Sequence, residues 1–285
     1  MEPKIINGKE ISAFVKEKIK SEVAKLCQKG VKVGLAVILV GDNPASKVYV
    51  ANKKKACEDL GIKSFEYLLG EDTTAEELLD LVNKLNNDDN VNGILCQLPL
   101  PKHLDEGEII NAISPEKDVD AFHPVNVGKI MIGDFDFLPC TPAGVMEMLK
   151  YCNIDVCGKE CVVIGRSNIV GKPMSMLLLH KNATVTICHS RTKDLPSVTK
   201  RADILISAVG KADFVTADMV KPGAVVIDVG MNRNSQGKLC GDVDYANVAP
   251  LCEAITPVPG GVGPMTIAML MQNTLTAAKK QNNIL

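Results

Sequence analysis

Short apolar runs alternate with segments of helical spacing along most of this 285-residue chain. In the first half, apolar runs at 33–41, 64–69 and 91–101 predict buried strands. The segments between them, 45–61 and 73–88, have the apolar spacing and end signals of amphipathic helices. Strands joined through helices form parallel sheets with helices on their faces, so this half predicts an α/β arrangement.

A second series of the same kind fills the other half. Apolar runs predict strands at 159–165, 183–190, 202–210 and 223–230. Helical spacing predicts helices at 141–153, 170–182 and 264–281. The segment 115–139 has weak periodicity and is the expected linker. We therefore expect an α/β protein of two α/β domains flanking a cleft, with the ligand near the carboxyl ends of the strands.

Composition narrows the classes of function. A chain of this length exceeds the size at which one core keeps growing, which agrees with two domains. The formal net charge of −2 is too small for general attraction to nucleic acid or to an anionic membrane. No apolar run reaches the roughly 18 residues of a membrane span, and the first residues lack the apolar core of a signal peptide. We expect no nucleic-acid partner and no membrane partner.

The ten cysteines are scattered along the chain and include no C-x2-C pair. Free thiols, used as small apolar side chains in a reducing compartment, explain this distribution better than zinc sites or disulfides. The expected location is therefore cytoplasmic.

The stretch "VVIGRSNIVGKPMSMLLL" at 162–179 reads as a strand, a glycine-bearing loop and a helix. The N-terminus of that helix would offer free N–H groups and the positive end of its dipole to a phosphate. Gly165 and Gly171 would let the backbone approach a ligand closely. Because Arg166 and Ser167 interrupt the usual G-x-G-x-x-G pattern, a plain tight turn explains the stretch about equally well.

The following strand ends in "CHSRT" at 188–192, where an NAD site would carry an acid for the ribose hydroxyls. Ser190 and Arg191 replace that acid, and Arg166 would lie alongside them. The planar fork of an arginine suits a phosphate dianion, so the sequence predicts NADP, bound through its extra phosphate. The alternative is that Arg191 is a solvated loop charge.

The stretch "YVANKKKA" places Tyr49 and Lys53 four residues apart, on one face of a helix. A solvated lysine face is the alternative reading of such a run. A lysine gains neutral population when it is desolvated or lies near another cation, and Lys54 is the nearest candidate cation.

Three further segments contain residues that could bind a ligand or take part in a reaction. Gln97 ends a strand in "CQLPLP", Asp118 and Asp120 lie in "PEKDVDAFHP", and the Pro- and Gly-rich "ITPVPGGVGPMT" precedes the last helix. An amine, an amide and a carboxylate around one ligand suit proton transfer on a nitrogen heterocycle. Glu116, Asp118 and Asp120 alternatively suggest a metal site, but no other ligand-rich segment supports one, and we expect no metal.

Five stretches together resemble the bifunctional methylenetetrahydrofolate dehydrogenase/methenyltetrahydrofolate cyclohydrolase family. They are "GDNPASKVYVANKKKA", "GILCQLPLP", "PEKDVD", "GRSNIVGKP" and "TPVPGGVGPMT", in the family's order and at its spacings. The resemblance runs from about residue 5 to residue 280. It implies a catalytic, folate-binding domain at 1–120, with the C-terminal helix at about 265–285 packing back on it, and a Rossmann-like NADP-binding domain at 121–264. One departure is Ala121, where glycine is commoner, and it concerns the local turn geometry.

The resemblance also implies roles for single residues. Lys53 would be the catalytic lysine, Tyr49 would stack on the aminobenzoate ring and help orient Lys53, and Gln97 would hydrogen-bond Lys53. Asp120 would bind the pterin ring, where a carboxylate accepts two N–H donors at once. The turn at Pro259, Gly260 and Gly261 would cover the folate and the nicotinamide. The cofactor-binding positions would be Gly165, Arg166, Ser167, Ser190, Arg191 and Met231.

By the same resemblance, the protein would oxidise 5,10-methylenetetrahydrofolate with NADP to 5,10-methenyltetrahydrofolate and hydrolyse that product to 10-formyltetrahydrofolate. This chemistry belongs to one-carbon metabolism and purine biosynthesis, and tetrahydrofolate one-carbon derivatives would be the ligands. A homodimer is expected. Three alternatives stay open: a dehydrogenase-only member of the family, a shikimate-type NADP dehydrogenase, and a nucleotide sensor that has lost catalysis.

Overall fold

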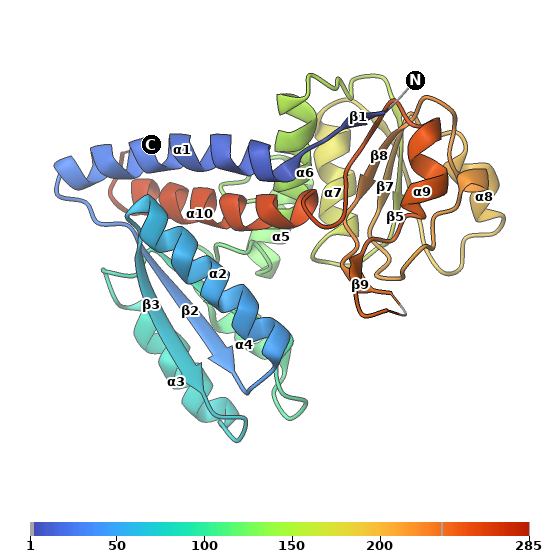
Figure 1. Cartoon of the computed structure of the whole chain (residues 1–285). Coiled ribbons are helices and arrows are strands. Elements are labelled where there is room, and N and C mark those ends of the chain that lie inside the picture. The colour runs from blue at the N-terminus through green and yellow to red at the C-terminus, as the bar shows by residue number, and fades with distance from the viewer. Residues whose placement is uncertain (1–2, 235, 285) are drawn as a thin grey trace. The chain divides into compact units, whose positions relative to one another are not determined.

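The computed structural model describes residues 3–234 and 236–284 (Figure 1). The chain divides into two compact units, and each unit is assembled from two separate segments. The three-strand unit comprises Phe14–Cys140 with Ile267–Leu285, and the six-strand unit comprises Met1–Ala13 with Thr141–Thr266. Each unit has its own parallel sheet, so the expected two-domain α/β class is confirmed.

The three-strand unit is built on a parallel sheet in the order β3–β2–β4. Its strands are β2 (Gly34–Val40), β3 (Lys63–Leu69) and β4 (Gly93–Cys96). Every residue of the central strand β2 is buried, which explains its unbroken apolar run. Helices α2 (Pro44–Leu60) and α3 (Ala75–Asn86) connect β2 to β3 and β3 to β4, in the predicted order.

Local sequence signals fix the ends of these two connecting helices. Asn43 caps α2 by accepting hydrogen bonds from the N–H groups of Ala45 and Ser46. The same helix ends at Gly61, whose φ of 75° is left-handed and favours glycine. Because both ends of α2 are fixed, the positions of the side chains along it are fixed as well.

Four more helices belong wholly or partly to the three-strand unit. They are α1 (Gly8–Gln28), α4 (Glu106–Ala112), α5 (Pro124–Ile132) and α10 (Val262–Gln281). Figure 1 shows α1 and α10 side by side, and within this unit Lys279 of α10 pairs with Glu22 of α1 at 2.8 Å. In the described part of the chain, no helix has both the length and the apolar character needed to span a membrane.

Helix α5 corrects the expectation for segment 115–139, which was expected to be a linker. The whole segment lies within the three-strand unit, and Asn126 and Ile130 of α5 are buried. The helix has Pro124 in its first turn and ends at Gly133, but it is only nine residues long. Such a short helix repeats its apolar face too few times for the spacing to stand out.

The six-strand unit contains one parallel sheet in the order β1–β11–β8–β7–β5–β6. In chain order, its strands are β1 (Lys4–Ile5), β5 (Glu160–Ile164), β6 (Thr184–Cys188), β7 (Ile204–Ser207), β8 (Val225–Asp228) and β11 (Ala254–Ile255). Strand β5 pairs with β6 on one side and β7 on the other, so the strand order reverses there. Ligands of open α/β sheets bind at such a reversal, beyond the carboxyl ends of the strands.

The remaining elements connect the strands of this sheet. They are the helices α6 (Cys140–Tyr151), α7 (Gly171–His180), α8 (Leu195–Thr199) and α9 (Tyr245–Val248), the 3-10 turns η1 (Ala217–Met219) and η2 (Ala249–Leu251), and the antiparallel pair β9 (Asn232–Arg233) and β10 (Leu239–Cys240). Helix α7 connects β5 to β6, so the predicted strand, glycine loop and helix follow one another in the structure.

The capping box of α3 gives a stability test. Thr74 accepts a hydrogen bond from the N–H of Glu77, and the Glu77 side chain accepts from the N–H of Thr74. Thr74→Ala should lower the free energy of unfolding by about 1 kcal/mol, because it leaves an N–H of the first turn without its acceptor. Urea unfolding followed by circular dichroism measures this. Glu77→Gln keeps an acceptor and should cost less; an equal or larger loss would contradict the hydrogen-bond explanation.

Candidate functional site

Helix α2 presents Tyr49 and Lys53 one turn apart, and Lys53 reaches the end of a strand. Lys53 Nζ donates a hydrogen bond to Gln97 Oε1 at 2.8 Å, and Gln97 directly follows β4. The amide nitrogen of Gln97 donates to the carbonyl of Leu98 at 2.7 Å, which fixes the direction of the amide oxygen. The structure therefore brings Tyr49, Lys53 and Gln97 together at the carboxyl end of the sheet.

Asp120 lies close enough to Lys53 for the two groups to influence each other's pKa. Burial raises the pKa of Asp120 to about 6, while the Lys53 ammonium opposes that rise. The thiol of Cys140 also lies against this carboxyl group, with Sγ 3.8 Å from Asp120 Oδ1. Asp118, in contrast, accepts a hydrogen bond from the Asn126 side chain at 2.8 Å. Of the two predicted carboxylates, Asp118 thus holds its own segment and Asp120 interacts with the lysine.

The electrostatic surroundings of Lys53 differ from the prediction in one respect. Burial is the main influence, and it lowers the pKa of Lys53 by disfavouring the charged ammonium. Lys54, the candidate neighbouring cation, instead pairs with Glu66 of β3 at 2.8 Å, and this pairing raises the pKa of Lys54. Four neighbouring groups act against this lowering of the Lys53 pKa: Asp120, Cys140, Cys57 and Cys96. Desolvation therefore accounts for the perturbed lysine, and Lys54 does not.

Ala121 follows Asp120 in a left-handed backbone conformation, with a φ of 57°. Its N–H donates to the carbonyl of Asp118 at 3.1 Å, which closes the turn that carries Asp120. A residue with a Cβ atom takes this conformation at a cost of roughly 1–2 kcal/mol. The same turn is therefore formed here without the glycine that is commoner at this position.

In the six-strand unit, the loop between β5 and α7 is closely packed. Gly165 has a φ of 130°, and a Cβ atom on it would lie 2.4 Å from the carbonyl oxygen of Ala208, after β7. A Cβ atom on Gly171 would lie 2.2 Å from the carbonyl oxygen of Gly165. Both glycines are therefore required by contacts of the backbone with itself.

The prediction of free N–H groups at the start of α7 is wrong for the first turn. Ser167 Oγ accepts from the N–H of Val170 at 3.1 Å and from that of Gly171 at 3.3 Å, and Ser167 O accepts from Lys172 at 3.1 Å. The next residue, Pro173, has no N–H to offer. Ser167 thus occupies N–H groups at the start of this helix, and the loop offers a ligand its exposed side chains instead.

The loops after β5 and β6 lie next to each other, because Gly165 N donates to Cys188 O at 2.9 Å. A tight turn follows β6, in which the N–H of Arg191 donates to His189 Nδ1 at 3.1 Å. This turn leaves Ser190 and Arg191 exposed, on the strand neighbouring that of Arg166. Guanidinium and hydroxyl donors at adjacent strand ends, without an acid among them, fit an anionic phosphate.

The Pro- and Gly-rich turn and Met231 lie in the same unit as this loop. Gly260 has a φ of 105°, and a Cβ atom on Gly8 would lie only 1.7 Å from the carbonyl oxygen of Gly261, so the turn packs tightly on the start of α1. A Cβ atom on Gly263 would lie 3.7 Å from Met231 Sδ. Met231, after β8, is therefore a neighbour of the turn that holds Pro259, Gly260 and Gly261.

Sequence reasoning missed two buried carboxylates at the ends of β7 and β8. Asp228 accepts from the N–H groups of Gly230 and Val243, each at 2.9 Å. Asp242 accepts from Ser207 Oγ at 3.1 Å and from the N–H of Val209 at 2.7 Å. Acids beside glycines, in "DVG" and "GDVD", were the available signal. These hydrogen bonds fix the backbone from which Met231 and the neighbouring loop start.

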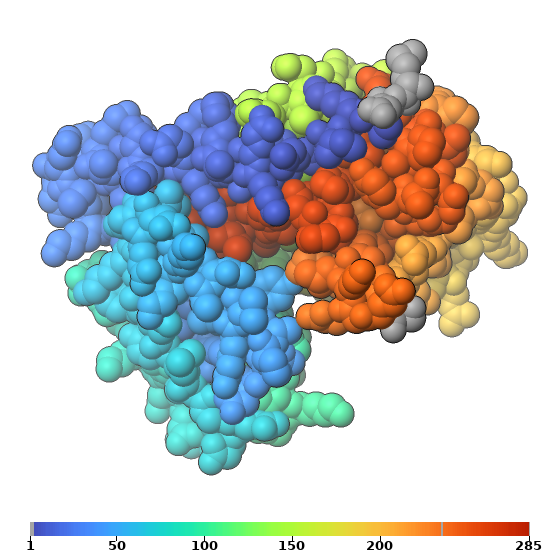
Figure 2. Space-filling model, in the orientation of Figure 1, coloured from blue at the N-terminus to red at the C-terminus, as the bar shows by residue number. Residues whose placement is uncertain are grey.

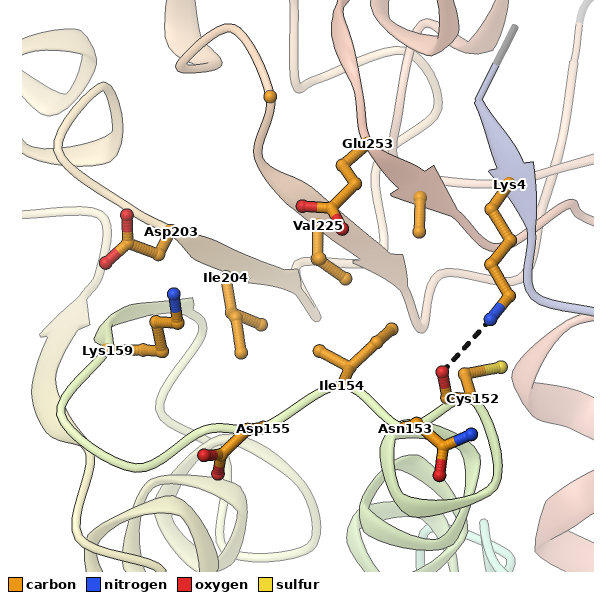
Figure 3. Close-up of a pocket in the computed structure, with 12 residues that line it drawn as sticks. Lys4, Cys152, Asn153, Ile154, Asp155, Lys159, Asp203, Ile204, Val225 and Glu253 are labelled. Atoms are coloured by element: carbon orange, nitrogen blue, oxygen red, sulfur yellow. Dashed lines mark hydrogen bonds between the residues drawn. The ribbon is translucent and has the colours of Figure 1, made fainter.

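One pocket of about 280 Å³ lies elsewhere on the six-strand unit (Figure 3). Its floor includes Ile204, Val225 and Ala254, which are the first residues of their strands. Figure 3 shows Lys4 at one end of the pocket, where its Nζ donates a hydrogen bond to the carbonyl of Cys152 at 3.0 Å. The pocket therefore lies at the amino ends of the strands. The predicted cofactor-binding residues follow the carboxyl ends of the strands, so they do not line this pocket.

Comparison with known families covers nearly the whole chain. Residues 6–120 match the model of the tetrahydrofolate dehydrogenase/cyclohydrolase catalytic domain. Residues 139–282 match the model of the tetrahydrofolate dehydrogenase/cyclohydrolase NAD(P)-binding domain.

Individual relatives are similar over their full length. The bifunctional protein FolD of Acetivibrio thermocellus is 65% identical over 281 residues, 99% of each chain. The FolD methylenetetrahydrofolate dehydrogenase/cyclohydrolase of Campylobacter jejuni has a crystal structure with a TM-score of 0.95 and 53% identity, covering 97% of this chain and 99% of that one. The Trypanosoma brucei enzyme, solved with NADP and an inhibitor, has a TM-score of 0.94 and 38% identity over 99% of both chains.

The contact between Lys53 and Gln97 can be tested without any turnover. Gln97→Glu keeps an acceptor beside Lys53 but adds a negative charge, which should raise the pKa of Lys53 by about one or more. Acetylation of each lysine as a function of pH, read by mass spectrometry, measures this. Glu66→Gln is the matched control, because Glu66 contacts Lys54. A Lys53 pKa that is unchanged by Gln97→Glu would contradict the observed contact.

Proposed function

Because the chain belongs to the tetrahydrofolate dehydrogenase/cyclohydrolase family, we propose that it oxidises 5,10-methylenetetrahydrofolate with NADP to 5,10-methenyltetrahydrofolate and then hydrolyses this to 10-formyltetrahydrofolate. The observation that carries the proposal is the desolvated Lys53, held by Gln97 at 2.8 Å and coupled to Asp120. A buried amine with a lowered pKa and a fixed partner is typical of a catalytic group rather than of a solvated lysine face.

In the hydrolytic step, Lys53 accepts the proton that the attacking water loses. Water adds to the methenyl carbon and releases one proton. The bond from this carbon to N5 then breaks as the remaining hydroxyl proton moves to N5, which leaves the formyl group on N10. Because burial lowers the pKa of Lys53, a larger fraction of it is neutral and able to accept the released proton. Gln97 holds the amine in place through its oriented amide oxygen.

In the oxidative step, bound NADP would supply the acceptor for the hydride of the methylene carbon. Arg166, Ser190 and Arg191 would hold its phosphates with their guanidinium and hydroxyl donors, beside the closely packed Gly165. Ser167 shapes the loop by capping α7. Met231, whose Sδ lies near Gly263 just after the turn at 259–261, would contact the nicotinamide end.

The folate is held by side chains around Lys53. Tyr49, which is 38% exposed, would stack on the aminobenzoate ring. Asp120 accepts N–H donors of the pterin ring, and Gln97 lies beside both the lysine and the substrate. The turn at Pro259, Gly260 and Gly261 completes the set of folate contacts.

We propose that residues 1–120, with the helix at about 265–285, carry the catalytic and folate-binding function and that residues 121–264 carry NADP binding, with residues 121–140 packed within the three-strand unit. The protein is a cytoplasmic homodimer that acts in one-carbon metabolism and purine biosynthesis. Its ten cysteines are free thiols, which supports a reducing compartment.

The test is a two-stage absorbance assay with methylenetetrahydrofolate, following NADPH and methenyltetrahydrofolate separately. NADPH formation with little methenyl product supports both activities. Persistent methenyl product indicates a dehydrogenase-only enzyme. Folded protein that forms no NADPH contradicts the proposal, and turnover of shikimate with NADP would then identify the shikimate-type alternative.

Lys53→Met should fold and lose the hydrolytic step, so that methenyltetrahydrofolate accumulates in the assay. The expected loss of cyclohydrolase rate is at least about 100-fold, the usual contribution of a positioned acid or base. Lys55→Met is the matched control, because Lys55 is exposed on the same helix and its loss should leave both rates unchanged. Full hydrolysis by Lys53→Met would remove Lys53 from the mechanism.

Arg191→Ala should reduce the preference for NADP over NAD, because it removes a charged donor from the 2′-phosphate. One charged hydrogen bond corresponds to a preference of roughly 10- to 150-fold. The measurement is kcat/KM with each cofactor. Lys193→Ala removes an equal charge from the same exposed loop and should have a smaller effect. Equal use of NAD and NADP by the native protein would contradict this cofactor assignment.

A further inference from the structure

We propose that Asn273, on the last helix, is a positioning residue for the folate site: its side-chain amide fixes the backbone on both sides of the Asp120 carboxylate. This inference rests on the proposed function, since it concerns the placement of Asp120 relative to Lys53. Asn273 is 5% exposed and far from Asp120 along the chain.

The amide of Asn273 connects two segments that meet at Asp120. Its nitrogen donates to the carbonyl of Val119 at 2.8 Å and to that of Leu138 at 2.8 Å. Val119 immediately precedes Asp120, and Leu138 lies two residues before Cys140, whose thiol lies against the carboxyl group. Both hydrogens of the amide are thus used, and both neighbours of the carboxylate are held.

The turn that carries Asp120 has other anchors as well: the Asn126 side chain donates to Asp118 at 2.8 Å, and the Cys140 thiol donates to Val119 O at 3.6 Å. The N–H of Ile94 donates to Lys117 O at 2.7 Å, which ties the start of the segment to the edge of β4. Beyond Asp118 the backbone turns away through Ala121 in its left-handed conformation. The carbonyl of Val119 is buried there, and a buried carbonyl without a donor is costly. Asn273 supplies the N–H donor at 2.8 Å, and the thiol of Cys140 is a second and weaker donor at 3.6 Å.

The same helix also contacts the segment that carries the lysine. The Cys57 thiol, one turn beyond Lys53 on α2, lies 3.6 Å from Met271 Sδ. Met271 and Asn273 are two residues apart on α10. One rigid helix therefore touches both the lysine helix and the aspartate turn, and so sets the spacing between Lys53 and Asp120 within the three-strand unit.

Asn273→Ala and Asn273→Asp test this by steady-state kinetics. Aspartate is isosteric but cannot donate when ionised, so both variants should raise the KM for methylenetetrahydrofolate about tenfold or more, with the KM for NADP changed less than about twofold. Asn273→Ser keeps one donor and should give an intermediate KM. Asn92→Ala is the matched control: Asn92 is equally buried in this unit, but it binds Gly34 and Gln281 instead. An unchanged folate KM in all Asn273 variants would overturn the proposal.

A second measurement separates this inference from the proposed function. Asp120 opposes the fall in the Lys53 pKa, so Asn273→Ala should lower the pKa of Lys53 further, in the same direction as Asp120→Asn. Acetylation as a function of pH reads this in protein that turns over no folate. A merely loosened core would admit water and raise the Lys53 pKa instead, and a rise or no change would overturn the positioning role. Absence of NADPH formation by the native protein counts against the proposed function alone.

Discussion

The burial of one amino group, that of Lys53, sets the demands on the rest of the three-strand unit. A lysine is removed from water only where a partner receives its hydrogen bond and nearby groups limit the cost. Gln97 provides the first, and Asp120 limits the cost through its charge. The unit supplies these groups from a strand end and a turn. Capped helix α2 delivers the lysine to that point.

The six-strand unit meets a different demand: it must expose hydrogen-bond donors to a phosphate from loops whose backbone is held in place. Adjacent parallel strands bring the loops after β5 and β6 together, and the capping of α7 by Ser167 stiffens the first of them. Figure 2 shows segments of the six-strand unit that are distant in the sequence in contact at its surface: the start of the chain (blue) lies against later segments (orange), in agreement with the pairing of β1 with β11. The two buried carboxylates, Asp228 and Asp242, hold the neighbouring strand ends through several backbone N–H groups.

Much of this architecture could be predicted from local sequence patterns. The unbroken apolar run of β2 indicates a buried strand, and the apolar spacing and capping residues of α3 indicate a helix. Short elements were not readable: α5 has too few turns, and strand β1 has only two residues. Contacts between distant parts of the chain were equally hidden. The sequence placed Lys53 and Gln97 in motifs, but Asn273 lies 154 residues from Val119, and nothing in its neighbourhood marks it.

The assembly of each unit from two separate segments affects how the protein is made. The chain leaves the three-strand unit at Cys140 and returns to it only at Ile267. A ribosome therefore releases the lysine helix long before the helix that carries Met271 and Asn273. Until that last helix emerges, the thiol of Cys57 lacks its contact with Met271, and the carbonyl of Val119 lacks the hydrogen bond from Asn273. The nascent chain cannot complete this unit before Met271 and Asn273 have been synthesised, whatever the order in which its earlier strands pair.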